Sequence, residues 1–298
     1  MTQDHIMRFG PAGNSQRFYD EGNTATVQAF AWIKAMGLNA YEYPFGRGVT
    51  MGEETAAAIG AEAALHGITL SAHAPYYINF AHPDPGMRQK SVGYVLSAAR
   101  TLHVMGGGRL VVHPGGSRAG DRAQAVALCA QGLAQVRQRL DDEGLDGIIL
   151  CPETMGKKGQ IGDLMETLAF CQMDARLVPC VDFAHLHALG QGALPDTEAF
   201  AAVLDKLEAA LGKKRARGMH AHFSTIEYGA SGEKKHHTFA EPDYGPRFEH
   251  LAPLLVQRGY HATIICESKG TMAEDAAHMR DVYHQAKLPN PNEAPSRI

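Results

Sequence analysis

The sequence is poor in cysteine and has no paired cysteine motif. Five cysteines are scattered over 298 residues, and no two of them are spaced as Cys-x-x-Cys. An odd and scattered set argues against a disulfide framework and against a four-cysteine zinc site. Cys151, Cys180 and Cys266 each lie inside an apolar run, which indicates small buried side chains.

A basic excess and long apolar runs are also missing. Lys and Arg number 28 against 32 Asp and Glu, which gives a formal net charge of −4. Proteins that bind nucleic acid usually carry a basic excess, so this charge counts mildly against such a partner. No apolar run is long enough to cross a bilayer, and Met1 to Arg8 lack the pattern of a signal peptide. We therefore expect a cytoplasmic protein with no membrane partner, and a monomer.

Short apolar or alternating runs recur along the chain and are separated by segments with helical periodicity. The predicted strands are Ile6–Gly10, Leu38–Pro44, Thr69–Pro75, Arg109–Gly115, Gly147–Thr154, Leu177–Asp182, Gly218–Ser224 and Thr263–Ser268. The predicted helices are Thr24–Met36, Glu53–His66, Met87–Met105, Ala119–Asp142, Ile161–Met173, Asp196–Leu211, Pro246–Arg258 and Met272–Gln285.

Eight strands that alternate with eight helices predict parallel βαβ units and an α/β fold. An open doubly wound sheet is the competing architecture. The count of eight, and polar residues at nearly every strand end, favour a (β/α)8 TIM barrel. No linker interrupts the alternation, so we expect one barrel domain over residues 1–287. Residues 288–298, rich in Pro and Asn, are predicted to be a C-terminal tail.

Ionisable residues follow the predicted strands at the edge where a TIM barrel carries its active site. Histidine is the commonest metal ligand, and the sequence has 16 of them, several in these positions. Such groups are costly at buried strand ends unless they are paired or bind metal. The residues at the strand ends are Glu42, His73, His113, Glu153, Asp182 with His185, His220 with His222, and Glu267.

The residue types narrow the predicted metal. Imidazole nitrogen and carboxylate oxygen, without thiolate, suit Zn²⁺, Mn²⁺ or Fe²⁺ better than Mg²⁺ or Ca²⁺. The candidates outnumber the ligands of one ion, because zinc is usually four-coordinate. A carboxylate can bridge two ions, and Glu153 lies centrally in the strand order. We therefore expect two or three ions, with Zn²⁺, Mn²⁺ and Fe²⁺ all open at this point.

The motifs HAPYYIN, HPG, PET, VDxxHxxALG, GMH and CES occur in this order near the strand ends. This series resembles the endonuclease IV family of apurinic/apyrimidinic endonucleases, within the xylose-isomerase-like barrels. The resemblance spans Leu38 to Glu267, although the segments RFGPAGNS and HFSTIEYG mark a divergent branch. It implies three zinc ions. The first would be held by His73, His113 and Glu153, and the second by Glu153, Asp182, His220 and Glu267.

The resemblance leaves two choices of ligand open. His185 would bind the third ion, but the family's Asp-x-His motif after strand seven is replaced here by GEKKHHTF. Glu233 and His236 are the nearest substitutes, and His237 is another candidate. His222 stands where the family usually has an uncharged amide, so it either replaces His220 or adds to it.

The implied activity is hydrolysis of DNA on the 5′ side of an abasic site, in base excision repair. Metal ions lower the pKa of a bound water and neutralise charge on the phosphate. In this interpretation Glu153 and Glu267 are the catalytic residues, since Glu153 bridges ions and orients the water while Glu267 is the base. Tyr76 and Asn79 match the family's stretch near the abasic site, and DNA is the expected partner.

Two further functions remain open from the sequence. In a sugar isomerase or epimerase on the same barrel, Glu153, Asp182, His220 and Glu267 would hold one Mn²⁺ or similar ion. Glu42 would then contact the hydroxyls of a small sugar substrate. The net charge suits this function, while the extra histidines do not. A barrel that binds a small ligand without catalysis is the third interpretation, and the crowded ionisable rim argues against it.

Overall fold

The apolar runs form eight parallel strands, each of which begins inside its predicted range. The computed structural model describes residues 6–116 and 121–288. The barrel strands are β1 (Arg8–Pro11), β2 (Ala40–Pro44), β3 (Thr69–His73), β4 (Arg109–Val112), β6 (Ile149–Pro152), β8 (Cys180–Asp182), β9 (His220–Phe223) and β12 (Thr263–Cys266).

These strands close into a barrel rather than an open sheet. Two runs of neighbours, β1-β12-β9-β8 and β2-β3-β4-β6, pair through regular parallel ladders. Single parallel bridges join the two runs, at Ala12 with Glu42 and at Glu153 with Cys180. The Thr154 amide donates to the Cys180 carbonyl at 3.0 Å, which continues the ladder between β6 and β8. The predicted (β/α)8 TIM barrel is confirmed.

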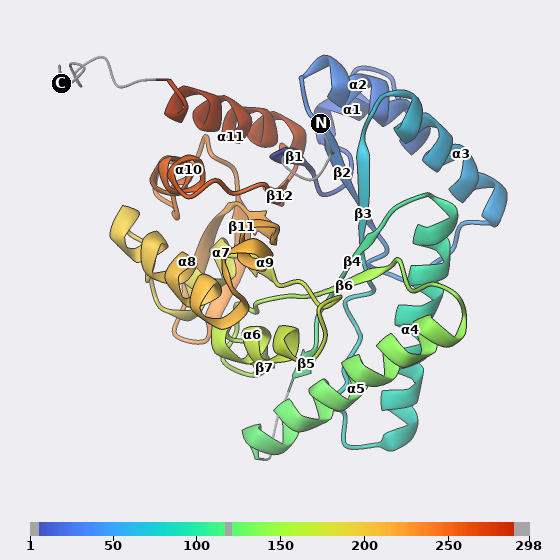
Figure 1. Ribbon diagram of the computed structural model, residues 1–298. Coiled ribbons are helices and arrows are strands. Elements are labelled where there is room, and N and C mark those ends of the chain that lie inside the picture. Colours follow the sequence, from blue (N-terminus) through green and yellow to red (C-terminus); the bar gives the residue numbers. More distant parts are fainter. Residues whose placement is uncertain (1–5, 117–120, 289–298) are drawn as a thin grey trace.

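Helices surround the strands on the outside of the barrel (Figure 1). Several begin at a side-chain cap, since Asp84, Asp121 and Asp163 each accept a bond from the backbone of the first turn. The helices that cover the strands are α2 (Ala29–Ala35), α3 (Glu53–Leu65), α4 (Pro85–Val104), α5 (Arg122–Asp142), α6 (Leu164–Gln172), α8 (Thr197–Leu211), α10 (Phe248–Gln257) and α11 (Met272–Ala286).

Several short elements were not predicted. The segment predicted as one helix, Thr24–Met36, is a 3₁₀ turn, η2 (Thr26–Gln28), followed by α2. The additional elements are α1 (Gln16–Asp20), α7 (Phe183–Leu189), α9 (Lys213–Arg217), the strand pair β5 (Gly115–Gly116) with β7 (Gln160–Ile161), and the hairpin β10 (Thr225–Gly229) with β11 (Gly232–His237). Both strand pairs sit beyond the C-terminal ends of barrel strands, so they shape the rim.

The core lies between the strands and the surrounding helices. Phe223 of β9 packs edge-on against Phe248 of α10 at 5.1 Å between ring centroids. Burying aromatic rings of this size is the main favourable contribution to such a fold. No helix in the described ranges is long and apolar enough to span a membrane. The predicted start of one helix at Ala119, and the predicted tail beyond Leu288, lie outside the described residues.

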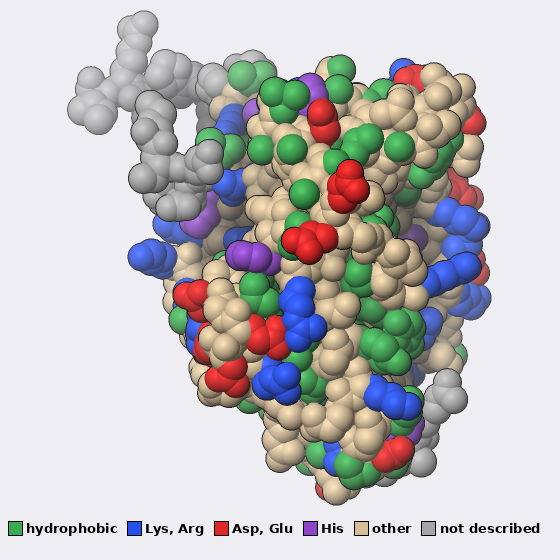
Figure 2. Space-filling view, turned by 90° about the vertical axis from the view of Figure 1, so that its right-hand side faces the viewer, with side chains coloured by type: hydrophobic (Ala, Val, Ile, Leu, Met, Phe, Trp, Pro, Cys, Tyr) green, Lys and Arg blue, Asp and Glu red, His purple; other side chains and the backbone are tan. Residues whose placement is uncertain are grey.

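Charged side chains of both signs are distributed over the surface. Figure 2 shows Lys, Arg, Asp and Glu interspersed on the face that lies to the right in Figure 1. Exposed ion pairs such as Arg100 with Glu143, 2.7 Å apart, lie on this outer layer of helices. The mixed charge on this face offers no broad basic field for nucleic acid.

Candidate metal centre

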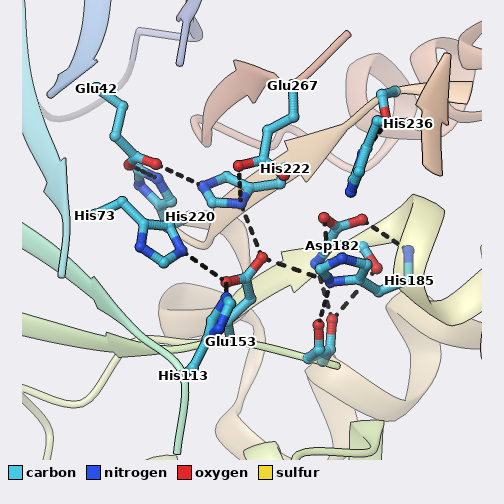
Figure 3. Close-up of polar contacts among 12 residues, drawn as sticks. Glu42, His73, His113, Glu153, Asp182, His185, His220, His222, His236 and Glu267 are labelled. Carbon is cyan, nitrogen blue, oxygen red and sulfur yellow. Dashed lines mark hydrogen bonds and ion pairs between the residues drawn. The ribbon is translucent and has the colours of Figure 1, made fainter. Parts of the chain in front are cut away.

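The strand ends bring histidines and carboxylates together inside the rim of the barrel (Figure 3). Parallel strands present their C-terminal ends to one side, so residues that are far apart in sequence converge there. The site residues are His73 at the end of β3, His113 after β4, Glu153 after β6, Asp182 at the end of β8, His185 in α7, His222 in β9, His236 in β11 and Glu267 after β12.

Glu153 lies at the centre of this arrangement. One of its oxygens, Oε2, is 2.8 Å from His113 Nε2 and 3.2 Å from His73 Nε2. The other oxygen, Oε1, is 2.9 Å from His222 Nδ1. Glu153 is fully buried. A carboxylate with its two oxygens turned toward different sets of ligands is placed as a bridging ligand would be.

Asp182 and α7 form the opposite side of the site. Asp182 is the N-cap of α7, where Oδ1 accepts a bond from the His185 amide at 2.8 Å. This cap holds the His185 ring beside the same carboxylate, with Nδ1 3.3 Å from Asp182 Oδ2. The Nε2 atom of His185 is 3.4 Å from Glu233 Oε2 on β11, and the His236 ring centroid lies 5.4 Å from that of His185. The hairpin β10–β11 therefore completes this side.

Buried charge of both signs shifts the pKa values of the site. Burial raises the pKa of Glu153, but the charges of His222 and His113 outweigh burial and hold that pKa well below its usual range. Burial lowers the pKa of His185, whereas Asp182 and Glu153 raise it, to about 9. In the absence of metal, the positive charge of the neighbouring histidines compensates the buried carboxylates. A bound metal ion would supply that positive charge instead.

The donor atoms fall into overlapping groups that fit metal ions. Within each group the ligand atoms lie within 4.8 Å of one another. Asp182 Oδ2 is buried without a hydrogen-bond partner, as expected of an atom reserved for a metal. Imidazole and carboxylate suit Zn²⁺, Mn²⁺ or Fe²⁺. The three groups at the rim are His73, His113 and Glu153; Glu153, Asp182, His222 and Glu267; and Asp182, His185 and His236.

His220 and His222 lie together with Cys180 in a fourth, deeper group of possible donors, but only His222 also reaches the carboxylates of the rim. The group that contains Glu153, Asp182 and Glu267 takes His222, where the resemblance implied His220. His220 lies one step deeper in the barrel, because β9 pairs His222 with Asp182 and His220 with Cys180. Of the two alternatives that the sequence leaves open, this grouping favours a His222 that replaces His220 as a donor.

The hairpin distinguishes His236 from His237. His236 faces His185 and also contacts Ser224 Oγ, 2.7 Å from its Nδ1. Its neighbour His237 points the other way, stacked on Tyr244 with Nδ1 2.6 Å from Glu241. His236 lines the cavity and His237 does not, so of the two histidines it is His236 that reaches the site.

The three residues predicted to contact substrate occupy different places. Tyr76 is 54% exposed at the rim and packs against the His73 ring. Asn79 instead braces two loops, since its Oδ1 accepts bonds from the amides of Ala81 and Gly116. Glu42 is 1% exposed beneath His222 and is not among the residues that line the cavity. Of the three, only Tyr76 is placed to meet a substrate directly.

A cavity of about 650 Å³ opens above the donor groups. Its walls include Lys157, Lys235 and Lys269, which come from three separate rim segments. Lys157 lies 3.7 Å from Glu233. Lys235 and Lys269 carry no signal in the sequence, because lone lysines outside a motif are usually solvated surface residues. Their common position around an acidic and histidine-rich floor is visible only in the fold.

Known proteins resemble this chain both in sequence and in structure. An uncharacterized protein of Methanocaldococcus jannaschii is 30% identical over 285 residues, which is 96% of this chain and 100% of that protein. A probable endonuclease 4 of Acholeplasma laidlawii is 29% identical over 167 residues, 54% of this chain and 55% of the relative. This chain thus spans about half the length of that relative.

Solved structures support the fold. A D-tagatose 3-epimerase-like protein matches with a TM-score of 0.69 at 16% identity, over 94% of this chain and 97% of that one. Endonuclease IV from Thermus thermophilus matches with a TM-score of 0.68 at 19% identity, over 94% and 98%. A model of the xylose isomerase-like TIM barrel family matches residues 30–282, and the chain belongs to that family.

Proposed function

We propose that this protein is a metal-dependent phosphodiesterase that cleaves DNA 5′ to apurinic/apyrimidinic sites, with two or three zinc ions. The observation that carries the proposal is the overlap of the three donor groups. Glu153 belongs to the first and second groups, and Asp182 belongs to the second and third. Shared carboxylates are the arrangement expected when neighbouring ions act on one phosphate.

The comparisons favour the same chemistry. Two of the relatives named probable endonuclease 4 are 29% and 25% identical to this chain over the aligned regions. An epimerase-like protein and an endonuclease IV have nearly equal structural similarity to this chain, so the fold does not separate the two reactions. The proposal therefore depends on the donor groups and on sequence relatedness.

Each site residue has a task in this reaction that follows from its position. Bound divalent ions supply positive charge to the phosphate and activate water as a nucleophile at neutral pH. Glu153 and Asp182 fix the spacing between the donor groups, because both are buried and rigidly held. The Glu267 side chain is 17% exposed and lines the cavity, so it can accept a proton from an attacking water.

The walls of the cavity suit an anionic substrate. Tyr76 exposes an aromatic face at the rim, where it can stack on a base or on the edge of an abasic gap. Lys235 and Lys269 are exposed at the same opening and can pair with phosphates that flank the scissile one. These residues give local positive charge to a protein whose net charge is −4.

Metal content and DNA cleavage together test the proposal. The protein is loaded with Zn²⁺, freed of excess metal and analysed for zinc per chain, and is then assayed on a duplex with one abasic site. We expect more than one zinc per chain and cleavage 5′ to the site. The variant Glu153→Gln should fold and lose activity. One tightly bound ion per chain, or no cleavage by the fully loaded protein, would contradict the proposal.

A sugar isomerase or epimerase is the second candidate, because the group of Glu153, Asp182, His222 and Glu267 could by itself hold one ion. Two carboxylates beside a metal-polarised carbonyl could then move protons on a ketose. Turnover of a ketose panel by protein with a single Mn²⁺ would favour this candidate. The remaining histidines at the rim would have no role in it.

A further inference from the structure

Glu42 is a buried carboxylate with no access to the cavity. It lies on β2 and is 1% exposed. Three donors from the barrel interior surround it: Ser71 Oγ lies 2.8 Å from Oε2, His220 Nε2 lies 2.9 Å from the same oxygen, and His222 Nε2 lies 2.8 Å from Oε1. A charged group in such a place is costly unless its neighbours compensate it.

Glu42 Oε1 and His222 Nε2 face each other at 2.8 Å as an ion pair. This contact lacks the geometry of a hydrogen bond, and neither atom has a hydrogen-bond partner among the described residues. The opposite nitrogen of the ring, His222 Nδ1, faces Glu153 Oε1 at 2.9 Å and Glu267 Oε1 at 3.4 Å. The imidazole therefore spans the space between a carboxylate beneath the site and the carboxylates of the second donor group (Figure 3).

We infer that Glu42 is a positioning residue that holds the His222 ring with Nδ1 directed at the second donor group. This inference extends the proposed function to a residue that touches neither substrate nor metal. A carboxylate on the far nitrogen of a ligating histidine keeps the proton there, fixes the tautomer and orients the ring. Ser71 and His220 hold the carboxylate in turn, so the interior of the barrel supports the rim.

The packing of the strands explains why the interaction needs this carboxylate. Glu42 reaches His222 across the barrel, from β2 to β9, because both side chains point into the interior. A substrate contact would require exposure that Glu42 does not have. If Glu42 only filled space, an uncharged side chain of similar volume would replace it without loss. Variants that keep the volume and remove the charge therefore distinguish packing from positioning.

The test compares Glu42→Gln and Glu42→Met, which keep the approximate volume and remove the charge. Metal-free protein is titrated with Co²⁺ and with Zn²⁺, and the visible absorption of bound Co²⁺ reports the ligand geometry. Losing a carboxylate partner of a metal-bound histidine typically costs roughly 10- to 100-fold in affinity. We expect that loss for one ion only, with an altered Co²⁺ spectrum, and a larger effect for Met than for Gln because the Gln oxygen can still accept.

A matched control is Glu166→Gln, a carboxylate with a structural role. Glu166 accepts bonds from the amides of Gly162 and Asp163 and pairs with Arg122 at the start of α6. Its loss should lower the free energy of unfolding without changing metal affinity. Circular dichroism checks that each variant folds.

Wild-type affinity and an unchanged Co²⁺ spectrum in folded Glu42→Gln and Glu42→Met would overturn the inference. The titration uses metal alone, so its result does not depend on the substrate. Metal binding that depends on Glu42 in a protein unable to cleave DNA would refute the proposed function and leave the role of Glu42 intact.

Discussion

Gly232 controls whether the hairpin β10–β11 can reach the site. Its φ of +102° lies in a region that residues with a Cβ rarely adopt. A Cβ at this position would also overlap the carbonyl oxygen of Gly156. Two backbone bonds fasten the hairpin there, from the Glu233 amide to Gly156 O at 2.9 Å and from the Lys158 amide to Ser231 O at 3.2 Å. Gly232→Ala should therefore loosen the hairpin.

The magnitude follows from these contacts. Positive φ costs a residue with a Cβ about 1–2 kcal/mol. Each lost hydrogen bond costs about 1 kcal/mol net. The substitution would weaken docking of the hairpin by about 3 kcal/mol. Because 1.4 kcal/mol is a factor of ten, the ratio of docked to undocked hairpin would fall roughly a hundredfold. His236 and Glu233 lie on β11, so the third donor group would lose affinity by up to that factor while the first and second groups keep theirs.

The assay is a Zn²⁺ titration of metal-free protein that counts ions and their affinities. The matched control is Gly106→Ala in the turn between α4 and β4, at the other end of the barrel. Gly106 has φ +71° and no atom within 4 Å of an added Cβ, so it bears only the backbone cost. We expect Gly106→Ala to lower unfolding stability with all ions bound. A Gly232→Ala protein that binds the same ions with wild-type affinity would refute the reasoning.

Three further outcomes are expected. His222→Asn should bind one ion fewer and lose activity. His220→Asn should bind the same number of ions as the wild type, with lower metal affinity. Equal loss of ions in both variants would contradict the grouping of donors. Lys235→Gln or Lys269→Gln should raise KM and lower the salt dependence of binding by about one phosphate contact. Lys234→Gln should not, because Lys234 pairs with Glu227 and does not line the cavity. Removing metal with a chelator should lower the Tm. Adding Zn²⁺ at 100 times its Kd should then raise the free energy of unfolding by about 2.7 kcal/mol. A Tm that chelation leaves unchanged would show that no resident ion was bound.

The sequence predicts the barrel well because all its strands share one recognisable pattern. Each strand is a short apolar run buried on both sides, and each run stands out against helical periodicity. The hairpin was missed because GEKKHH has no apolar alternation. Its strand conformation comes from pairing with β10 and docking on Gly156, which are tertiary contacts. Helix α7 was missed because it is only seven residues long and begins directly after β8, whose last residue, Asp182, is its N-cap.

The residue types of the site are visible in the sequence, but their assignment is not. His220 and His222 both point into the barrel, since strand residues two apart share a face. Only the pairing of β9 with β8 shows that His222 is level with Asp182. Glu42 likewise appears at a strand end, where a substrate contact is a natural expectation. The structure buries it, because Glu42 lies beneath the His222 ring and not at the cavity.

The number of ions, more than the fold, separates the two candidate reactions. An isomerase needs one ion, and the second donor group alone could hold it. In that case His73 and His113 would be buried or half-buried imidazoles whose Nε2 atoms face Glu153, a carboxylate already engaged by the ion. Evolving such groups without a ligand would add desolvation cost and no chemistry. Ions in the neighbouring groups would remove that cost and give the extra histidines a function, which is the argument for the proposed phosphodiester hydrolysis over the isomerase.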